Sequence, residues 1–425
     1  MSHKQFSNFD ASQPNFLVLD LMRKEKTIIL LLACINFTHI MDFMIMMPLG
    51  PQLMRLFDIQ PAAFSFLVSA YTFSAGISGF LSAFVVDRFD RKTILLFGYI
   101  GFTLGTLACA LAQQYETLVA ARILAGLFGG LIGAQVLSII ADLVPFERRG
   151  AAMGTLSTAF SAASVFGVPF GLYAATQWSW QAPFYIIAGL GFLIIPAVYS
   201  FLPPVREHLT NRGEAAPPNP LQIIRQVVQD RNQRMGLLFA SGMIAGHFCM
   251  IPFISPYMVA NVGFLESELP YIYILGGGLI IFTAPYVGKM ADQYGKRRVL
   301  NWFVLLSAIP VLLITNLPRM PIYYLLVITT LFFVVTNGRM IPSQAIISSV
   351  VLPQYRGSFM SINSSLQQLA TGLAAYVGGL IIQKNAQGEL LHYGYVGVLG
   401  LSISFACLWV AAQLKAVDAQ PAIKT

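Results

Sequence analysis

The chain of 425 residues is 56% hydrophobic and only 10% charged, with a formal net charge of +8. Charged residues make up about a quarter of a soluble domain, so this composition excludes an ordinary soluble protein and predicts one that lies in a bilayer. No basic helix or cluster of stacking aromatic residues lies outside the apolar segments, so we expect no nucleic-acid partner.

Apolar segments predict twelve transmembrane helices, because a bilayer core of ~30 Å requires about 20 apolar residues per helix. They cover residues 27–49, 62–86, 94–113, 117–141, 151–174, 183–201, 235–259, 271–291, 299–316, 322–349, 359–382 and 395–413. An even number of spans places both termini on the same side of the membrane. We therefore expect an all-α membrane protein.

Polar stretches divide these spans into two groups. Residues 1–26 lack the apolar centre of a signal peptide, so we expect the first span itself to direct insertion. The longest polar connection contains five prolines and five arginines, and we interpret it as a linker in which residues 221–228 form a short surface helix. The expected division is a tail at 1–26, six-helix bundles at 27–202 and 235–414, a linker at 203–234, and a tail at 415–425.

The basic residues predict the orientation. Of 26 lysines and arginines, 21 lie in loops, in tails or at a span end on the side of the termini, 3 lie in loops on the opposite side, and 2 lie deeper within spans. This bias predicts cytoplasmic termini, and the short loops favour a bacterial inner (plasma) membrane. The four cysteines lie far apart in apolar segments without the spacing of metal ligands, so we expect core thiols and no metal site.

Two landmarks occur twice in the same order, which indicates a duplication. The first landmark is an apolar segment that ends at an aspartate and is followed by a basic turn. The second is an arginine-glycine turn that precedes the next span. The repeated landmarks are residues 83–92 with 288–297, and residues 145–150 with 353–357. Asp87 and Asp292 lie 205 positions apart, and Arg149 and Arg356 lie 207 positions apart. We therefore expect two pseudosymmetric six-helix bundles.

This arrangement of spans and turns resembles the major facilitator superfamily over nearly the whole chain. The loop signature of the family is matched in the second copy at Gly288, Asp292, Gly295, Lys296 and Arg297. In the first copy Ala83 and Asp90 replace the usual glycines, although Asp90 tolerates left-handed backbone geometry.

A further segment resembles the family as a whole, and two others resemble its arabinose-efflux-permease-like branch of proton-coupled drug and sugar exporters. Arg122 lies in a segment similar to the arginine signature of the family, and residues 167–171 resemble its proline-glycine signature. Met41 and Asp42, followed by Pro48, complete the likeness. The resemblance implies the major facilitator fold, secondary transport of a small molecule by a monomer in the lipid bilayer, and no cofactor.

The repeated aspartates predict a conformational latch between the halves. An aspartate at the C-terminal end of a helix is disfavoured by the helix dipole and requires a partner. For Asp87 the candidates are Arg91 and the start of the eleventh span after Arg356, and for Asp292 the start of the fifth span after Arg149. These pairs would close the inner side when the cavity opens outward. Alternatively, both are solvated turns that fix orientation.

Ionisable residues within membrane spans mark ion or substrate pathways. Asp42 and Arg122 each lie ~10 Å from the outer ends of the first and fourth spans, at 1.5 Å per residue. We expect Asp42 to exchange protons and Arg122 to tune it, because burial raises a carboxyl pKa whereas a nearby arginine lowers it. A permanent structural ion pair is the alternative.

Other polar residues outline a substrate cavity. They are Asn36, His39, Gln135, His247, Asn337, Arg339 and Gln344. Each histidine has the alternative of a satisfied core residue, and Arg339 that of an arginine reaching the inner interface. Methionines near the first-span site, such as Met44, would supply adaptable apolar walls for amphiphilic substrates, or simply pack.

The expected function is proton-driven export of small amphiphilic or sugar-like compounds by rocking of the two halves. The same residues permit proton-linked uptake. An intramembrane enzyme is disfavoured because the metal-binding His-Glu-x-x-His and nucleophile Gly-x-Ser-x-Gly motifs are absent. A transporter-like sensor would require a large soluble domain, which the chain lacks.

Overall fold

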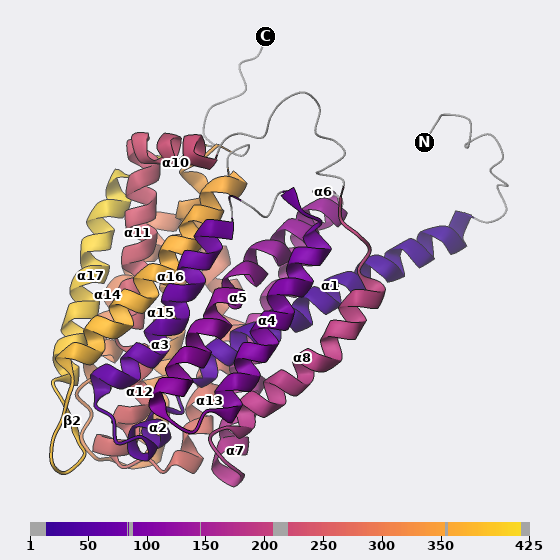
Figure 1. Ribbon diagram of the computed structural model, residues 1–425. Helices are drawn as coiled ribbons and strands as arrows, with labels where there is room; N and C mark the ends of the chain where they lie inside the picture. The colour runs from indigo at the N-terminus through magenta and orange to yellow at the C-terminus, as the bar shows by residue number, and fades with distance from the viewer. Residues whose placement is uncertain are drawn as a thin grey trace.

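The computed structural model describes residues 14–82, 84, 88–144, 146–206, 220–352 and 356–417, and almost all of this part is helical (Figure 1). Helices satisfy every backbone hydrogen bond internally, which a bilayer requires. The first half contains α1 (Pro14–Ile45), α2 (Gly50–Leu56), α3 (Pro61–Ser82), α4 (Arg91–Leu111), α5 (Tyr115–Leu143), α6 (Phe146–Ala162), the π-helix η3 (Ala163–Gly167), α7 (Val168–Gln177) and α8 (Ala182–Phe201).

The second half follows a short helix, α10 (Pro220–Gln229), which agrees with the surface helix expected in the linker. It contains α11 (Arg231–Phe248), η4 (Ile251–Phe253), α12 (Ile254–Tyr257), η5 (Met258–Val262), η6 (Glu266–Glu268), α13 (Leu269–Tyr294), α14 (Lys296–Ile314), α15 (Ile322–Ser349), α16 (Arg356–Ile381), β1 (Gln383–Lys384), β2 (Leu390–Leu391) and α17 (Tyr393–Gln413). The two short strands pair antiparallel.

Eleven helical segments of the described residues are long and apolar enough to cross a membrane. The remaining span, the eleventh in chain order, is α16, whose 26 residues include serines, an asparagine and glutamines that lower its hydropathy. Its length matches the other spans, and it runs beside α3 in Figure 1. The expected all-α fold of twelve transmembrane helices in two pseudosymmetric six-helix bundles is confirmed.

Small residues bring α3 and α16 together across the two halves. A Cβ at Gly379 would lie 2.0 Å from Ser65 Oγ, and one at Gly372 would lie 2.6 Å from Thr72 Oγ1. Contacts that pair later residues of α3 with earlier residues of α16 show that the helices are antiparallel. Ser69 donates a hydrogen bond of 2.8 Å to the Gly372 carbonyl. Close backbone approach of this kind provides helix packing in lipid.

Two proline-containing spans are interrupted, where the sequence predicted continuous helices. Proline lacks an N–H and clashes with the carbonyl four residues earlier. Accordingly α11 ends at Phe248, four residues before Pro252, and the π-helix η3 contains Val165, four residues before Pro169. The break in the fifth span accompanies close packing on α1, because a Cβ at Gly171 would lie 2.8 Å from Ile45 Cδ1.

The duplicated turn begins its two helices in different ways. Asp90 has φ −59° and ψ 125°, and its carboxylate caps α4 by accepting a hydrogen bond from the Lys92 N–H. Its pseudosymmetric equivalent Gly295 has φ 92° and provides no side-chain cap for α14. Left-handed geometry at Asp90 is therefore not used, because its side chain satisfies the helix start instead.

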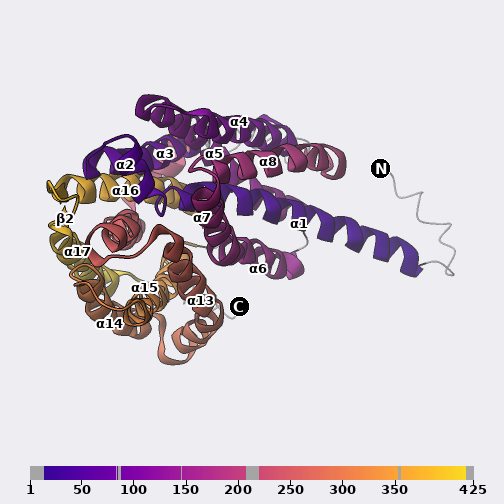
Figure 2. The ribbon, with the colours of Figure 1, turned by 90° about the horizontal axis from the view of Figure 1, so that it is seen from below.

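The two ends of the molecule differ in how the halves meet. We call the end that carries α10 the linker face and the opposite end, which carries α2, the α2 face (Figure 1). Viewed from the α2 face, α4, α5 and α8 lie on one side and α13, α14 and α15 on the other (Figure 2). One hydrophobic cluster at the α2 face contains residues of both halves, including Phe64 and Phe253, whose rings lie 6.0 Å apart.

The fifth and eighth spans pack together in the part nearer the α2 face. A Cβ at Gly277 of α13 would lie 3.2 Å from Val165 of η3. Toward the linker face, a Cβ at Gly154 of α6 or at Gly288 of α13 would have no atom within 4 Å. The described residues therefore close the α2 face, whereas Gly154 of α6 and Gly288 of α13 face open space toward the linker face.

Candidate functional site

Asp42 and Arg122 form an ion pair between α1 and α5. Arg122 Nη1 donates to Asp42 Oδ2 at 2.7 Å, and both side chains are 0% exposed. Thr106 of α4 donates to the other carboxylate oxygen at 3.1 Å. The guanidinium carbon lies 4.3 Å from the centre of the Tyr71 ring, a cation–π contact from α3. Four helices of the first half thus hold one buried charged pair, as the shared membrane depth of the two residues predicted.

His39 lies one turn before Asp42 and faces a glycine on α5. A Cβ at Gly129 would lie 3.0 Å from His39 Nε2 and 2.8 Å from the Tyr71 hydroxyl oxygen. Both of these buried polar atoms lack a hydrogen-bond partner in the described part of the chain. Glycine at this position therefore leaves space beside two polar groups, in addition to allowing close helix packing.

Arg339 and His247 form a second polar centre, in the other half. Arg339 is 0% exposed, and its Nη1 donates to Ser404 Oγ of α17 at 3.0 Å. Its Nη2 lies 3.4 Å from His247 Nδ1 on α11. The His247 ring stacks on Phe332 with centroids 6.4 Å apart. The alternative in which Arg339 reaches the inner interface is wrong for this conformation, because the side chain turns into the bundle.

Aromatic rings connect the two centres across the halves. Tyr71 stacks on Phe43 at 5.8 Å, and Phe43 lies 5.9 Å from Phe248 of α11. Phe248 in turn meets His247 edge to face at 5.6 Å. His39 and His247 are 208 positions apart, close to the repeat offsets, so each half places a histidine at an equivalent position.

The remaining cavity candidates are less closely associated with these centres. Asn36 and Asn337 are half-buried, whereas Gln344 is exposed. Gln135 is buried, with its amide oxygen unpaired within the described residues. It lies 13 residues beyond Arg122 on α5, or roughly 20 Å at 1.5 Å per residue. The structure therefore does not bring Gln135 to the Asp42 level.

The predicted latch residues lie in different surroundings. Asp87 is outside the described residues, and Arg149 lies in the first turn of α6 without a described side chain. Arg356 begins α16 and is half-buried. Arg91 donates from Nε to Asp142 of α5 at 2.5 Å, a partner that the sequence did not suggest.

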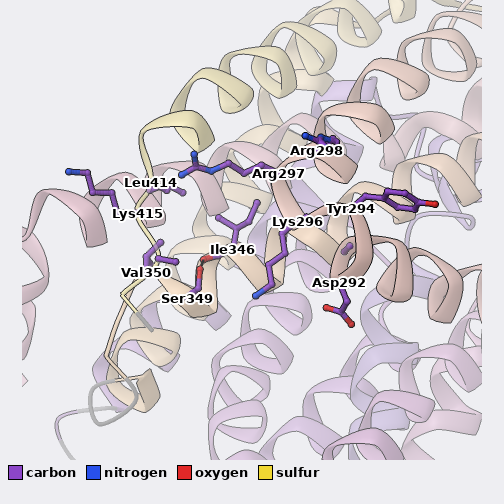
Figure 3. A pocket seen from close by; sticks show the side chains of 13 residues that line it. Asp292, Tyr294, Lys296, Arg297, Arg298, Ile346, Ser349, Val350, Leu414 and Lys415 are labelled. Carbon is purple, nitrogen blue, oxygen red and sulfur yellow. Dashed lines mark hydrogen bonds between the residues drawn. The ribbon is translucent and has the colours of Figure 1, made fainter. Parts of the chain in front are cut away.

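Asp292 is exposed at the linker face, in a cavity of about 650 Å³ with Lys296 and other basic residues. Figure 3 shows Asp292 and Lys296 extending to one side of this cavity and Arg297 to another. Within the described residues Asp292 forms no hydrogen bond or ion pair. The expected pairing of Asp292 with the start of α6 is therefore absent among the described residues in this conformation.

Sequence reasoning missed several residues of the site. Thr106, Tyr71, Phe248 and Ser404 contribute contacts through helix packing, and uncharged residues of these types occur throughout the spans. The one signal in the sequence was the spacing of His39 and His247, which is close to the repeat offset and indicates equivalent positions in the two halves.

A duplicated bundle of twelve helices, with charged side chains buried inside each half, defines a membrane transport protein. The chain belongs to the Major Facilitator Superfamily, whose family model matches residues 32–281 and 237–423. It is therefore a secondary transporter and not an enzyme.

Known proteins are similar over most of the chain. The uncharacterized MFS-type transporter YbcL of Bacillus subtilis is 22% identical, covering 92% of this chain and 96% of the relative. The putative transporter AraJ of Escherichia coli is 24% identical, covering 82% and 84%. The crystal structure of a D-xylose-proton symporter has a TM-score of 0.73 at 16% identity, covering 93% and 99%. The expected resemblance to the arabinose-efflux-permease-like branch is confirmed.

Proposed function

We propose that this transporter is a proton-driven exporter of small amphiphilic or sugar-like compounds. Residues 27–202 and 235–414 would move as two bodies about the site, with the linker face in the cytoplasm of a bacterial cell. The observation that carries the proposal is Asp42, a carboxylate with 0% exposure whose charge is balanced by one arginine. A change in these surroundings would alter the balance between the charged and the protonated carboxyl.

The mechanism follows from the balance at Asp42. Burial disfavours the charged carboxylate, whereas Arg122 at 2.7 Å favours it. A movement of α1 relative to α5 that lengthens this contact would favour the protonated acid, and the freed guanidinium would then interact more strongly with the Tyr71 ring. Restoring the pair would release the proton. The halves would alternate between closing the α2 face, as here, and closing the linker face.

The latch residues take the complementary role at the linker face. Asp87 with Arg91 and Arg356, and Asp292 with the α6 start at Arg149, would be engaged when the α2 face opens. The exposed carboxylate of Asp292 supports this proposal, because the group is available in the conformation where the latch would be open.

Proton-linked uptake is the second candidate function. It uses the same Asp42–Arg122 pair, and the solved structure of a D-xylose-proton symporter shares the fold. The direction of the proton gradient that drives accumulation of a compound in vesicles separates export from uptake.

The test uses purified protein in proteoliposomes with an imposed proton gradient and labelled arabinose, ethidium and phenylacetate. We expect gradient-driven movement of at least one compound, its loss in Asp42→Asn, and retention of binding in that variant. Asp58→Asn is the matched control, because Asp58 is exposed in the connection after α2 and has φ 48°, which asparagine also adopts. Full gradient-driven transport by Asp42→Asn would reject the proposal and favour a structural ion pair.

A further inference from the structure

Arg339 is a buried cation without a carboxylate in its own half. Residues 231–417 contain only four acidic residues. Glu266 and Glu268 lie in η6, Glu389 lies in the connection between β1 and β2, and Asp292 lies at the exposed end of α13. All four are therefore at the ends of the spans, whereas Arg339 lies 17 residues after the start of α15.

The contacts of Arg339 are neutral. Ser404 Oγ accepts from Nη1 at 3.0 Å and His247 Nδ1 accepts from Nη2 in a long contact of 3.4 Å. The third nitrogen, Nε, is buried and has no hydrogen-bond partner among the described residues. Arg122, the other arginine within a span, instead has a carboxylate at 2.7 Å.

A buried guanidinium without an opposite charge is costly in a bilayer. An anion that binds beside it offsets part of this cost, so this centre favours a negatively charged ligand. His247 supplies a second donor: because a guanidinium only donates, Nδ1 of the ring must accept, and the ring proton then lies on Nε2. His247 is half-buried, in contrast to the fully buried Arg339.

The surroundings of His247 are apolar and aromatic. Phe332 stacks on its ring, and Phe248 contacts it edge to face. Phe43 of the first half continues this surface, and both Phe43 and Phe248 are half-buried where the halves meet. A ligand here would meet a positive group at one end and aromatic rings from both halves along its length.

We propose that Arg339 and His247 form an anion-binding subsite and that the cargo is an amphiphilic organic anion, with a carboxylate on Arg339 and an apolar body on the phenylalanines. This inference rests on the proposed transport function and narrows its substrate class. Because the apolar body would contact Phe43 and Phe248 together, binding would also couple the two halves.

Thermal shifts of the purified full-length protein in detergent at neutral pH test the subsite. Matched pairs of acid and amide are used as probes: phenylacetate with phenylacetamide, and octanoate with octanamide. A ligand that binds the folded state raises the melting temperature. We expect at least one carboxylate, but neither amide, to stabilise the wild type, and its apparent affinity to fall roughly tenfold or more in Arg339→Gln, since a charge-assisted contact is lost.

Arg319→Gln is the matched control, because it removes an arginine of the same half that is exposed in the connection before α15. Arg319→Gln should be stabilised by the carboxylate probe, rather than by its amide, to the same extent as the wild type. His247→Phe preserves ring stacking but removes both nitrogens, so it should weaken binding of the carboxylate probe. This variant tests the inference if Arg339→Gln does not fold. Equal shifts from acid and amide, no carboxylate-selective shift in either pair, or an undiminished shift in His247→Phe and Arg339→Gln would overturn the inference.

The result is separable from proton coupling, because these shifts are measured without a gradient. Carboxylate preference that persists in Asp42→Asn supports the subsite whatever that variant does in vesicles. Loss of coupling in Asp42→Asn without any preference for carboxylates would reject the anion subsite alone.

Discussion

Asp42 Oδ2 lies 2.7 Å from Arg122 Nη1, and both residues belong to the first half of the protein. The ion pair therefore does not itself join the halves. Its connection to the second half runs through the Tyr71 ring beneath the guanidinium and then through Phe43 and Phe248. Movement of one half against the other would reach the charged pair by displacing these rings.

The first prediction concerns the stability of this pair. Arg122→Gln leaves the Asp42 carboxylate buried without its counter-charge, which costs about 3–5 kcal/mol for a buried pair. The double variant Asp42→Asn and Arg122→Gln removes both charges, so we expect it to melt at a higher temperature than Arg122→Gln alone. Melting curves of the four proteins in one detergent form the cycle. Strictly additive losses would show that the two side chains do not interact in solution.

The second prediction concerns the ion pair that closes the α2 face. Arg55 of α2 pairs with Glu266 of η6, and the arginine side chain is 62% exposed. An exposed pair contributes about 0–1 kcal/mol, so Glu266→Gln should shift the equilibrium toward opening at this face by up to about fivefold. Spin-label distances between α2 and η6 measure the shift. Glu268→Gln is the control, because Glu268 accepts from the Leu265 N–H within its own turn.

High salt should reproduce part of the Glu266→Gln effect, since the Arg55 side chain faces solvent. If the distance distribution responds equally to Glu266→Gln and Glu268→Gln, the pair between the halves is not the cause.

The third prediction concerns the packing of α3 against α16. A Cβ at Gly379 would lie 2.0 Å from Ser65 Oγ and 3.0 Å from the Pro61 carbonyl oxygen. Gly379→Ala should therefore separate the helices near the α2 face at a cost of about 1–3 kcal/mol. We expect greater reactivity of a cysteine placed at Ser69 toward a water-soluble thiol reagent. Gly278→Ala, where a Cβ would have no atom within 4 Å, should leave that reactivity unchanged.

Much of the fold followed from the sequence because span length and charge bias are strong local signals. The tenth span, predicted at residues 322–349, is identical to α15 (Ile322–Ser349). The same signals did not reveal the interruptions at η3 and after Phe248. A hydropathy pattern records apolar residues but not the carbonyl that each proline displaces.

The site was predictable only where charge marked it. Asp42 and Arg122 stood out because ionisable residues are rare in spans, and their depth correctly suggested contact. The partners of Arg339 could not be recognised in the sequence. Ser404 resembles many other serines, and only the packing of α17 against α15 brings it to Arg339. Conversely, Gln135 was grouped with the cavity by residue type alone, and its position along α5 separates it from Asp42.

The fourth prediction concerns Asp90, which connects the start of α4 to the beginning of the linker. Its carboxylate accepts from the Lys92 N–H at 2.9 Å, the Val205 N–H at 3.0 Å and Arg206 Nε at 3.0 Å. Partial burial raises the pKa of this carboxyl, but the hydrogen bonds from Val205, Arg206 and Lys92 outweigh it, so the net pKa is lowered.

Because the folded pKa of Asp90 is below its unfolded value of about 3.9, its stabilising effect is present above that pH and is lost as the pH falls through the folded pKa. Asp90→Asn should therefore speed hydrogen exchange at the Val205 amide at neutral pH. The difference from wild type should persist at the unfolded pKa and shrink only as the pH falls through the lowered folded pKa, where the wild-type carboxyl becomes protonated. Asp58→Asn, an exposed aspartate at the other face, is the control. Equal protection of Val205 in wild type and Asp90→Asn at pH 7 would show that the carboxylate does not hold the linker start, and that the backbone hydrogen bond from Arg91 N–H to the Val205 carbonyl, at 3.3 Å, is sufficient.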